Sequence, residues 1–481
     1  MFTTLCRLAR VEILGWTRRR SLLIVFIGLA ALVLISIAVG LQDLASREQD
    51  YHAQLASIVK EQVKPRLPMT GAGVERVLRV ARPAELGSLV ARGEDTRLAS
   101  YFDFGPGGLQ WGQAAGSDAS QMQAASVFDL ESIIRVIGGL IALLLGIDVV
   151  GASRFRGQLL AWQSLGLDPA VGVAGKLLGC AGLLVSGCVL LLGTAALATG
   201  LQLRDDAPGI AALLTSNLVP IALYLCVLAG VGGAVALWSR SLATASIAGV
   251  AVWLTIAIIG PQLGGIAGRL LVPVTSRAEF ERARDQRYAE DNRAVEDALG
   301  EQLVEALAGR PEQVPPVEPD AAIKQYETRL ESVWSARTQA SRELARSTER
   351  EWADAQNRQT QLNRWLQLLT PGACFDAATA ALSGTGGGLS QAWLELAESQ
   401  QRQLTAALFD NRSQPTVRFK GEMFAFRRHA TLRWSDLPAP PPLELRSRWR
   451  EAREPLLALV AYLVLVSLAI RAGARRLSSG I

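Results

Sequence analysis

Histidine and cysteine are scarce in this sequence, which has two His and five Cys among 481 residues. The two imidazoles, His52 and His429, belong to distant parts of the chain, and no Cys or His spacing typical of a zinc or haem site occurs. Three of the cysteines lie within apolar runs, and Cys374 has no second cysteine in its polar stretch. We therefore expect no metal, no cofactor and no intrachain disulfide in that stretch.

Motifs for catalysis and nucleotide binding are also missing. The nearest approach to a phosphate-binding loop, Gly172 to Leu177, lacks the first Gly and the Ser or Thr that would hold magnesium. No Gly-x-Ser-x-Gly or His-Glu-x-x-His pattern occurs. The net charge is +5, and the basic residues lie among acidic ones or beside apolar runs. They do not form the stripe of basic and aromatic residues that is typical of nucleic-acid binding. The sequence thus predicts a chain that is not an enzyme and binds no nucleic acid.

Long apolar runs are the dominant feature that is present. A helix needs roughly 20 apolar residues to cross a hydrocarbon core about 30 Å thick. Six runs reach that length or come close to it, and we assign them as membrane-spanning helices at residues 21–41, 132–151, 171–201, 210–238, 241–265 and 455–471. The predicted fold class is an all-α polytopic membrane protein with six transmembrane helices. The first run is longer than the apolar part of a signal peptide and no small-x-small cleavage site follows it, so we interpret it as an uncleaved anchor.

The placement of arginine predicts the orientation. Arg18 to Arg20 precede the first run, Arg154 and Arg156 follow the second, Arg240 separates the fourth from the fifth, and Arg475 lies beyond the sixth. With six spans these positions share one side, which the positive-inside rule makes cytoplasmic. An N-terminal interfacial helix (1–20), the loop 152–170 and the tail 472–481 then lie inside. Because arginine far exceeds lysine, as in GC-rich bacteria, we expect a bacterial inner (cytoplasmic) membrane.

Two long polar stretches, 42–131 and 266–454, are then extracytoplasmic. The first begins as a helical continuation of the first span and continues as a small irregular subdomain. The second is mainly helical, with an amphipathic helix over 321–369 that pairs antiparallel with a helix over 277–307. Its aromatic stripe, which includes Trp334 and Trp365, fits core packing or a ligand site, and we favour packing.

Three charged residues lie within or beside the spans. Asp148 and Lys176 fall at similar depth on the cytoplasmic side and could form an intramembrane ion pair; alternatively, Lys176 extends to the interface and Asp148 marks a helix end. Arg135, at the outer start of the second span, is interpreted as an interfacial residue. The basic, amphipathic loop from Arg154 to Gly166 suits either lipid contact or docking to a cytoplasmic partner.

Several stretches, taken in order, resemble type-2 ABC exporter permeases. They are Gly139 to Asp148, the amphipathic loop, and Gly175 to Gly179. Two further sets resemble the branch of that family with two large extracytoplasmic insertions, whose substrates are mostly unassigned: Pro83 to Gly93 with Tyr101 and Phe128-Asp129, and Leu369-Thr370-Pro371 with Phe375, Ala378, Leu382 and Ser383 to Gly386.

The resemblance implies a non-catalytic subunit that works with other chains. Its partners would be cytoplasmic ATP-binding cassette ATPase subunits, which hold the ATP and magnesium, a second permease copy or paralogue, membrane lipid and a periplasmic partner. The loop would be the coupling helix that contacts the ATPase. Family members usually carry acidic residues in this loop, where this chain has Arg154 and Arg156. The residues assigned to coupling are Arg154, Phe155, Arg156, Gln158, Leu159, Trp162 and Leu165.

Three functions remain open at this point. The chain could be a conduit for an exported substrate, or a transmitter that performs conformational work on an outer partner, or a membrane-bound sensor or scaffold without an ATPase. The basic loop favours the last of these, and the order of the family stretches favours the first two.

Overall fold

The structure is a computed structural model of the whole chain. It describes residues 9–10, 12–15, 20–63, 78–81, 85–93, 101–105, 108–111, 129–164, 166, 168–202, 207–275, 279–280, 282–283, 286–287, 290, 293, 347–348, 350–352, 354–388, 392–393, 395–396, 399, 416–419, 424–427 and 445–478.

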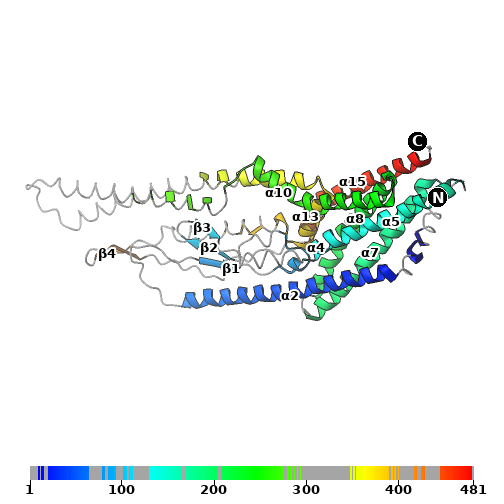
Figure 1. The fold of residues 1–481 in the computed structure, drawn as a ribbon. Helices are drawn as coiled ribbons and strands as arrows, with labels where there is room; N and C mark the ends of the chain where they lie inside the picture. The colour runs from blue at the N-terminus through cyan, green and yellow to red at the C-terminus, as the bar shows by residue number, and fades with distance from the viewer. Residues whose placement is uncertain are drawn as a thin grey trace, which may run out of the picture. The chain divides into compact units, whose positions relative to one another are not determined.

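Within the described residues, six helices are long and apolar enough to cross a membrane, as the sequence predicts. They lie at Ile24–Ala53, Leu130–Phe155, Pro169–Thr194, Gly209–Trp238, Leu242–Leu271 and Leu445–Arg476. The elements that contain them are α2 (Arg20–Val63), α4 with η3 and α5 (Leu130–Ile133, Ile134–Gly138 and Gly139–Phe155), α7 (Pro169–Gln202), α8 (Ala207–Trp238), α9 with η5 and α10 (Leu242–Leu254, Thr255–Ile259 and Gly260–Leu271), and α15 (Leu445–Ser478). The protein is therefore an all-α polytopic membrane protein (Figure 1).

Helix α8 is the centre of the bundle, where it packs against α5, α7, α9, α13 (Pro371–Ser383) and α15. Small residues allow α5 and α8 to approach closely. A Cβ atom on Gly146 would lie 1.9 Å from the Ala229 carbonyl oxygen, and one on Gly232 would lie 2.1 Å from the Leu143 carbonyl oxygen. Without bulk water to drive apolar association inside a bilayer, such close backbone contact is a main source of helix affinity.

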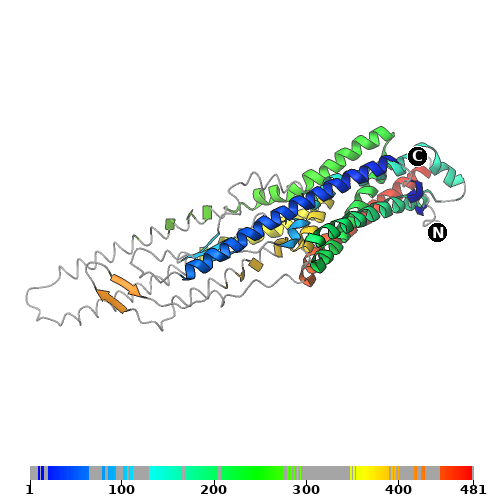
Figure 2. The same cartoon turned by 90° about the horizontal axis from the view of Figure 1, so that it is seen from below.

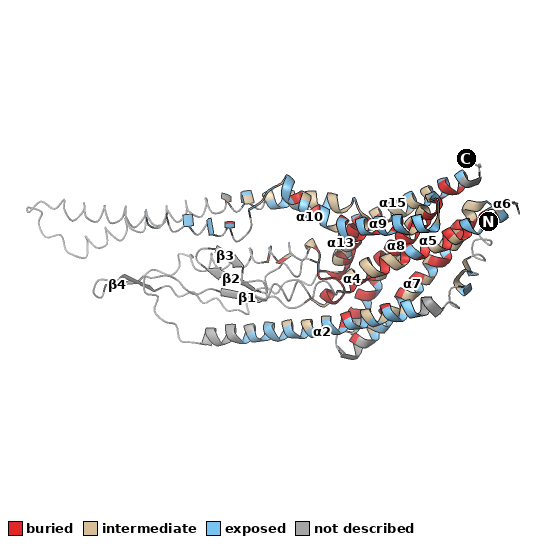
Figure 3. Ribbon diagram, in the orientation of Figure 1, coloured by how far each residue is buried: buried red, intermediate tan, exposed pale blue. Residues whose placement is uncertain are grey.

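The helices differ in how much of their surface the chain itself covers. Buried residues concentrate on α5 and α8, whereas α2 and α9 are mainly exposed (Figure 3). Exposed apolar side chains on these two helices include Ile24, Ile27 and Ile247, at 61% to 74% exposure. Such faces are suited to lipid or to another transmembrane helix.

Two of the spanning helices continue past their apolar runs. Helix α2 runs unbroken through 44 residues (Figure 2). At a rise of 1.5 Å per residue this is about 66 Å, roughly twice the thickness of the hydrocarbon core. Helix α15 begins at Leu445, ten residues before the predicted span, and contains Pro455. The helical continuation predicted after the first span is thus present.

In the part of the chain that the structure describes, five short strands form two small antiparallel sheets. Strands β1 (Leu78–Ala81), β2 (Tyr101–Gly105) and β3 (Gly108–Trp111) form one sheet in that order, and β4 (Thr416–Phe419) pairs with β5 (Phe424–Arg427) in the other. In the registers, Leu78 lies opposite Phe104 and Thr416 opposite Arg427. The first sheet falls in a stretch that we expected to be irregular.

Residues 265–364 form a second compact unit, separate from the rest of the chain. Within it, Gln359 Nε2 donates to the Val272 carbonyl oxygen at 2.9 Å, and Trp352 Nε1 donates to that of Thr275 at 3.2 Å. The Trp352 ring also stacks on Phe280 at a centroid distance of 5.3 Å. Gln359 thus contacts Val272, and the earlier residue Trp352 contacts the later residues Thr275 and Phe280. The two segments therefore run antiparallel.

The core-packing interpretation of the aromatic stripe is wrong for Trp365, which is 71% exposed in the isolated chain. Residues 294–346 and 428–444 lie outside the described residues. The predictions made for those parts of the stretch 266–454, including the packing of Trp334, therefore stay predictions.

Candidate functional site

The predicted coupling loop contains a short helix, α6 (Gln158–Ser164), between α5 and α7. Glycines in the left-handed region border it, with φ of +72° at Gly157 and +76° at Gly166. A side chain at either position would be strained, so these glycines allow the chain to turn sharply out of α5 and toward α7. The loop lies at the same end of the bundle as both chain termini (Figure 1).

Arg154, at the C-terminal end of α5, is hydrogen-bonded within the bundle. Its guanidinium donates to the carbonyl oxygens of Ala236 and Leu237, each at 2.8 Å, and to that of Ser239. These carbonyls belong to the last turn of α8 and the residue after it, where a helix has unsatisfied acceptors and a partial negative charge. Arg154 therefore fastens the end of α5 to the end of α8.

The face of α6 that meets α7 is also occupied. Leu159 is 5% exposed and belongs to the apolar core. The ring of Trp162 packs on α7 at Gly172, where a Cβ atom would lie 2.2 Å from a ring carbon. Lys176 Nζ donates to Gln158 Oε1 at 3.1 Å and lies 5.5 Å from the Trp162 ring centroid.

Lys176 forms its salt bridge with the N-terminal segment. Its Nζ lies 3.6 Å from Glu12 Oε2, and both side chains are more than four-fifths buried. The backbone of Ala9 lies against α7 at Gly179. The predicted pair between Asp148 and Lys176 stays a prediction, with Asp148 half-buried on α5.

Of the residues assigned to coupling, Phe155 and Arg156 project from the loop most freely. Phe155 is 41% exposed, and Arg156 is exposed as well. Gln158 is exposed but bound to Lys176. Leu165 lies outside the described residues. One side of the loop therefore packs on the bundle. The ring of Phe155 and the guanidinium of Arg156 remain exposed beside it.

A second site lies at the opposite end of the bundle, around α13. The hydroxyl of Thr370 accepts from the Ala373 N–H at 3.4 Å and caps the helix start, and Gly384, at φ +74°, ends it. The segment 85–93 packs directly on the C-terminal end of α13. A Cβ atom on Gly87 would lie 1.7 Å from the Ser383 carbonyl oxygen, and Thr385 Oγ1 donates to the Ala91 carbonyl oxygen at 2.8 Å.

Residues from separate parts of the sequence thus meet in one junction. They come from the stretches 83–93, 128–129 and 369–386, in which the sequence resembles the permease family. The Glu131 N–H donates to the Val90 carbonyl oxygen at 3.0 Å, which ties the start of span two to the same place. We call the contact among 85–93, the start of span two and α13 the α13 junction.

Charged side chains are buried inside the α13 junction. Arg135, which we had interpreted as interfacial, pairs with Asp376 Oδ2 of α13. Glu131, one turn before Arg135, is 7% exposed. Tyr224 of α8 donates its hydroxyl to the Arg135 carbonyl oxygen at 3.0 Å and stacks on Phe375. Sequence reasoning missed this cluster, although the i, i+4 spacing of Glu131 and Arg135 at a span end was a signal.

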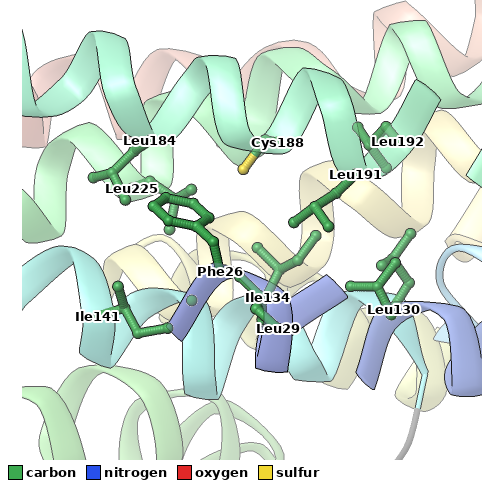
Figure 4. Close-up of a pocket in the computed structure, with 12 residues that line it drawn as sticks. Phe26, Leu29, Leu130, Ile134, Ile141, Leu184, Cys188, Leu191, Leu192 and Leu225 are labelled. Atoms are coloured by element: carbon green, nitrogen blue, oxygen red, sulfur yellow. The ribbon is translucent and has the colours of Figure 1, made fainter. Parts of the chain in front are cut away.

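A narrow apolar cavity lies among α2, α4 to α5, α7 and α8. Side chains from α2 and α7, among them Phe26 and Cys188, point toward each other across it (Figure 4). None of its lining residues is charged; they are Phe26, Leu29, Val33, Leu130, Ile134, Gly138, Ile141, Leu184, Cys188, Leu191, Leu192 and Leu225. Its lining side chains are apolar apart from the Cys188 thiol, so a charged solute would find no counterion in it.

Comparison with protein-family models, with curated proteins and with solved structures finds no match to this chain.

Proposed function

We propose that this protein is the membrane-spanning permease subunit of an ATP-binding cassette transporter. The observation that carries the proposal is the construction of the α6 loop. Its inner face is fixed to the bundle by Leu159 and Trp162, while Phe155 and Arg156 are left exposed beside it. A helix that is fixed on one side and exposed on the other suits the transfer of movement from a docked partner into the membrane.

The contacts of the loop define where such movement would go. The hydrogen bonds of Arg154 join α5 to α8, and the salt bridge between Lys176 and Glu12 joins α7 to the N-terminal segment. A push on α6 would therefore move these elements together. Because α8 contacts the α13 junction through Tyr224, the movement would reach the opposite end of the bundle.

The rest of the assembly belongs to the same proposal. This chain is non-catalytic, ATP and magnesium bind to a separate cytoplasmic ATPase subunit, and a second permease copy or paralogue completes a dimer in a bacterial inner membrane. The exposed apolar faces of α2 and α9 would meet lipid or that second copy. Both chain termini would be cytoplasmic, and the stretches 42–131 and 266–454 would face a periplasmic partner.

Co-purification tests the proposal. A tagged chain extracted gently from its native membrane is expected to bring down an ATP-binding subunit and ATPase activity. The double variant Phe155→Ala, Arg156→Glu should lose that subunit at least tenfold, whereas Arg471→Glu, the same charge change at an exposed position outside the loop, should keep it. If the native chain brings down no ATP-binding subunit, or the loop variant retains it fully, the proposal fails.

A second candidate function, the transmission of force without transport, is favoured by α2 and by the cavity. The unbroken α2 extends well past the thickness of a bilayer, as a lever would, and the cavity offers no polar path. In proteoliposomes that hold this chain together with its ATPase subunit, a transmitter would show ATP hydrolysis without ATP-dependent movement of lipid or solute, and an exporter would show that movement.

A further inference from the structure

The C-terminal ends of three spanning helices, α5, α8 and α15, meet at the α6 end of the bundle. Gly473 of α15 packs on α8 so closely that a Cβ atom there would lie 3.1 Å from both Leu237 Cβ and Trp238 Nε1. The same Nε1 donates to the Ala469 carbonyl oxygen at 3.5 Å, and Arg154 joins the end of α5 to this turn of α8. Trp238 is thus held against α15, yet it is 52% exposed. An exposed Trp at the end of a span is typical of the membrane interface.

A guanidinium lies on this exposed ring. Arg476 Cζ is 5.4 Å from the ring centroid of Trp238, and both side chains are exposed. This cation–π contact fixes where the positive charge lies at the membrane surface. A guanidinium carries a fork of N–H donors that matches two oxygens of a phosphate group.

The three helix ends carry an excess of positive charge. Residues 148–157, 230–246 and 465–478 contain six arginines and one acidic residue, Asp148. All of these arginines except Arg154 are exposed. A cluster of this kind between the ends of spanning helices is suited to the headgroups of anionic lipids.

An apolar stripe of α15 leads from Arg476 into the span. Leu465 and Leu468 are 59% and 57% exposed, and Ala472 is exposed as well. These residues and Arg476 follow one another at intervals of three or four, so they lie on one face of the helix. The stripe from Leu465 to Arg476 is about 16 Å long, close to the depth of one leaflet of a bilayer. A charged group at the surface and an apolar face below it match the two parts of a phospholipid.

We propose that Trp238 and Arg476 form a binding site for an anionic phospholipid in the leaflet at the α6 end of the bundle. The phosphate accepts hydrogen bonds from Arg476, and an acyl chain lies along the stripe of α15. A free phosphate ion would use only the charged part of this site. A zwitterionic lipid would bring an ammonium group next to a surplus of arginine. The site therefore prefers phosphatidylglycerol to both phosphatidylcholine and inorganic phosphate.

Native mass spectrometry of the full-length chain purified in detergent tests the site. Phosphatidylglycerol and phosphatidylcholine with the same acyl chains are supplied at equal concentration, and the native chain should retain more phosphatidylglycerol. Arg476→Gln should lower the retention of phosphatidylglycerol by about fivefold and leave that of phosphatidylcholine unchanged, because it removes one charge beside the phosphate. Trp238→Leu should lower it by about twofold, through loss of the cation–π contact.

The matched control is Arg471→Gln, which removes the same charge from an exposed position on another face of α15. It should lower the retention of phosphatidylglycerol by less than about twofold, since surface charges outside the site act weakly. Equal retention of both lipids by the native chain would overturn the inference. An equal loss in Arg471→Gln and Arg476→Gln would also overturn it, because the charge would then act diffusely and not as a site.

Thermal unfolding separates the lipid from a free phosphate ion. A ligand that binds the folded state stabilises it, so phosphatidylglycerol should raise the unfolding temperature of the native chain more than phosphatidylcholine does. Inorganic phosphate at the same concentration should leave it unchanged, and a rise equal to that with phosphatidylglycerol would overturn the lipid assignment. If a variant does not fold, this comparison on the native chain decides alone. Both tests use this chain without an ATPase, so their outcome is independent of the function proposed above.

Discussion

At the scale of single residues, charge alone does not reveal the partner of a side chain. Arg154 looks from the sequence like a basic residue poised for docking. Its guanidinium instead binds main-chain carbonyls 82 to 85 residues away. Carbonyl acceptors at a helix end carry no side-chain signature, so only the packing of α5 on α8 could reveal this contact.

Truncation of this side chain should therefore affect stability more than docking. We expect Arg154→Ala to lower the free energy of unfolding by about 1–3 kcal/mol, because it leaves helix-end carbonyls without a donor. Arg156→Ala, two residues away and exposed, should change it by less than about 0.5 kcal/mol. Thermal unfolding of the purified chain in detergent measures both variants. If they are equally stable, the hydrogen bonds of Arg154 contribute nothing, and its role would have to be sought in partner binding.

At the scale of elements, local residue types account for the ends of α13, and non-local packing explains its role. The side chain of Thr370 caps the start of the helix, Pro371 follows as its first residue, and Gly384 ends it in the left-handed conformation. The burial of α13 against 85–93 was not predictable in the same way. The two segments are about three hundred residues apart, and Gly87 and Ser383 meet through backbone, which leaves no complementary side-chain pattern.

The closeness of that contact gives a prediction for Gly87. In Gly87→Ala the new methyl group would lie 1.7 Å from the Ser383 carbonyl oxygen, so segment 85–93 would have to move away from α13. We expect a loss of about 1–3 kcal/mol in stability, the usual range for overpacking. Gly193→Ala is the matched control, since nothing lies within 4 Å of its new Cβ atom and alanine favours the helix. Limited proteolysis should cut the Gly87→Ala chain faster in this segment and leave the control at the native rate; equal rates would show that the junction accommodates the methyl group.

At the scale of the whole molecule, hydropathy predicted the six spans because a bilayer admits almost only helices of sufficient apolar length. It could not predict where the helices end. Helix α2 continues to Val63 and α15 starts at Leu445, since backbone hydrogen bonds continue a helix whether or not its side chains are apolar. The orientation of the chain in the membrane is predicted from the placement of arginine alone. It determines whether the α6 loop can contact a cytoplasmic ATPase subunit.

Cysteine labelling can establish that orientation, although the native Cys374 is a poor reporter. Its side chain is fully buried, and burial raises the pKa of its thiol to about 12, so almost no reactive thiolate forms at neutral pH. We propose two exposed positions instead, Gln356→Cys in the unit 265–364 and Ser164→Cys on α6, each with Cys6→Ser. A membrane-impermeant maleimide applied to spheroplasts should label Gln356→Cys at once and Ser164→Cys only after the membrane is opened. The reverse order would place α6 outside the cell, and a loop on that side could not receive work from an ATPase in the cytoplasm.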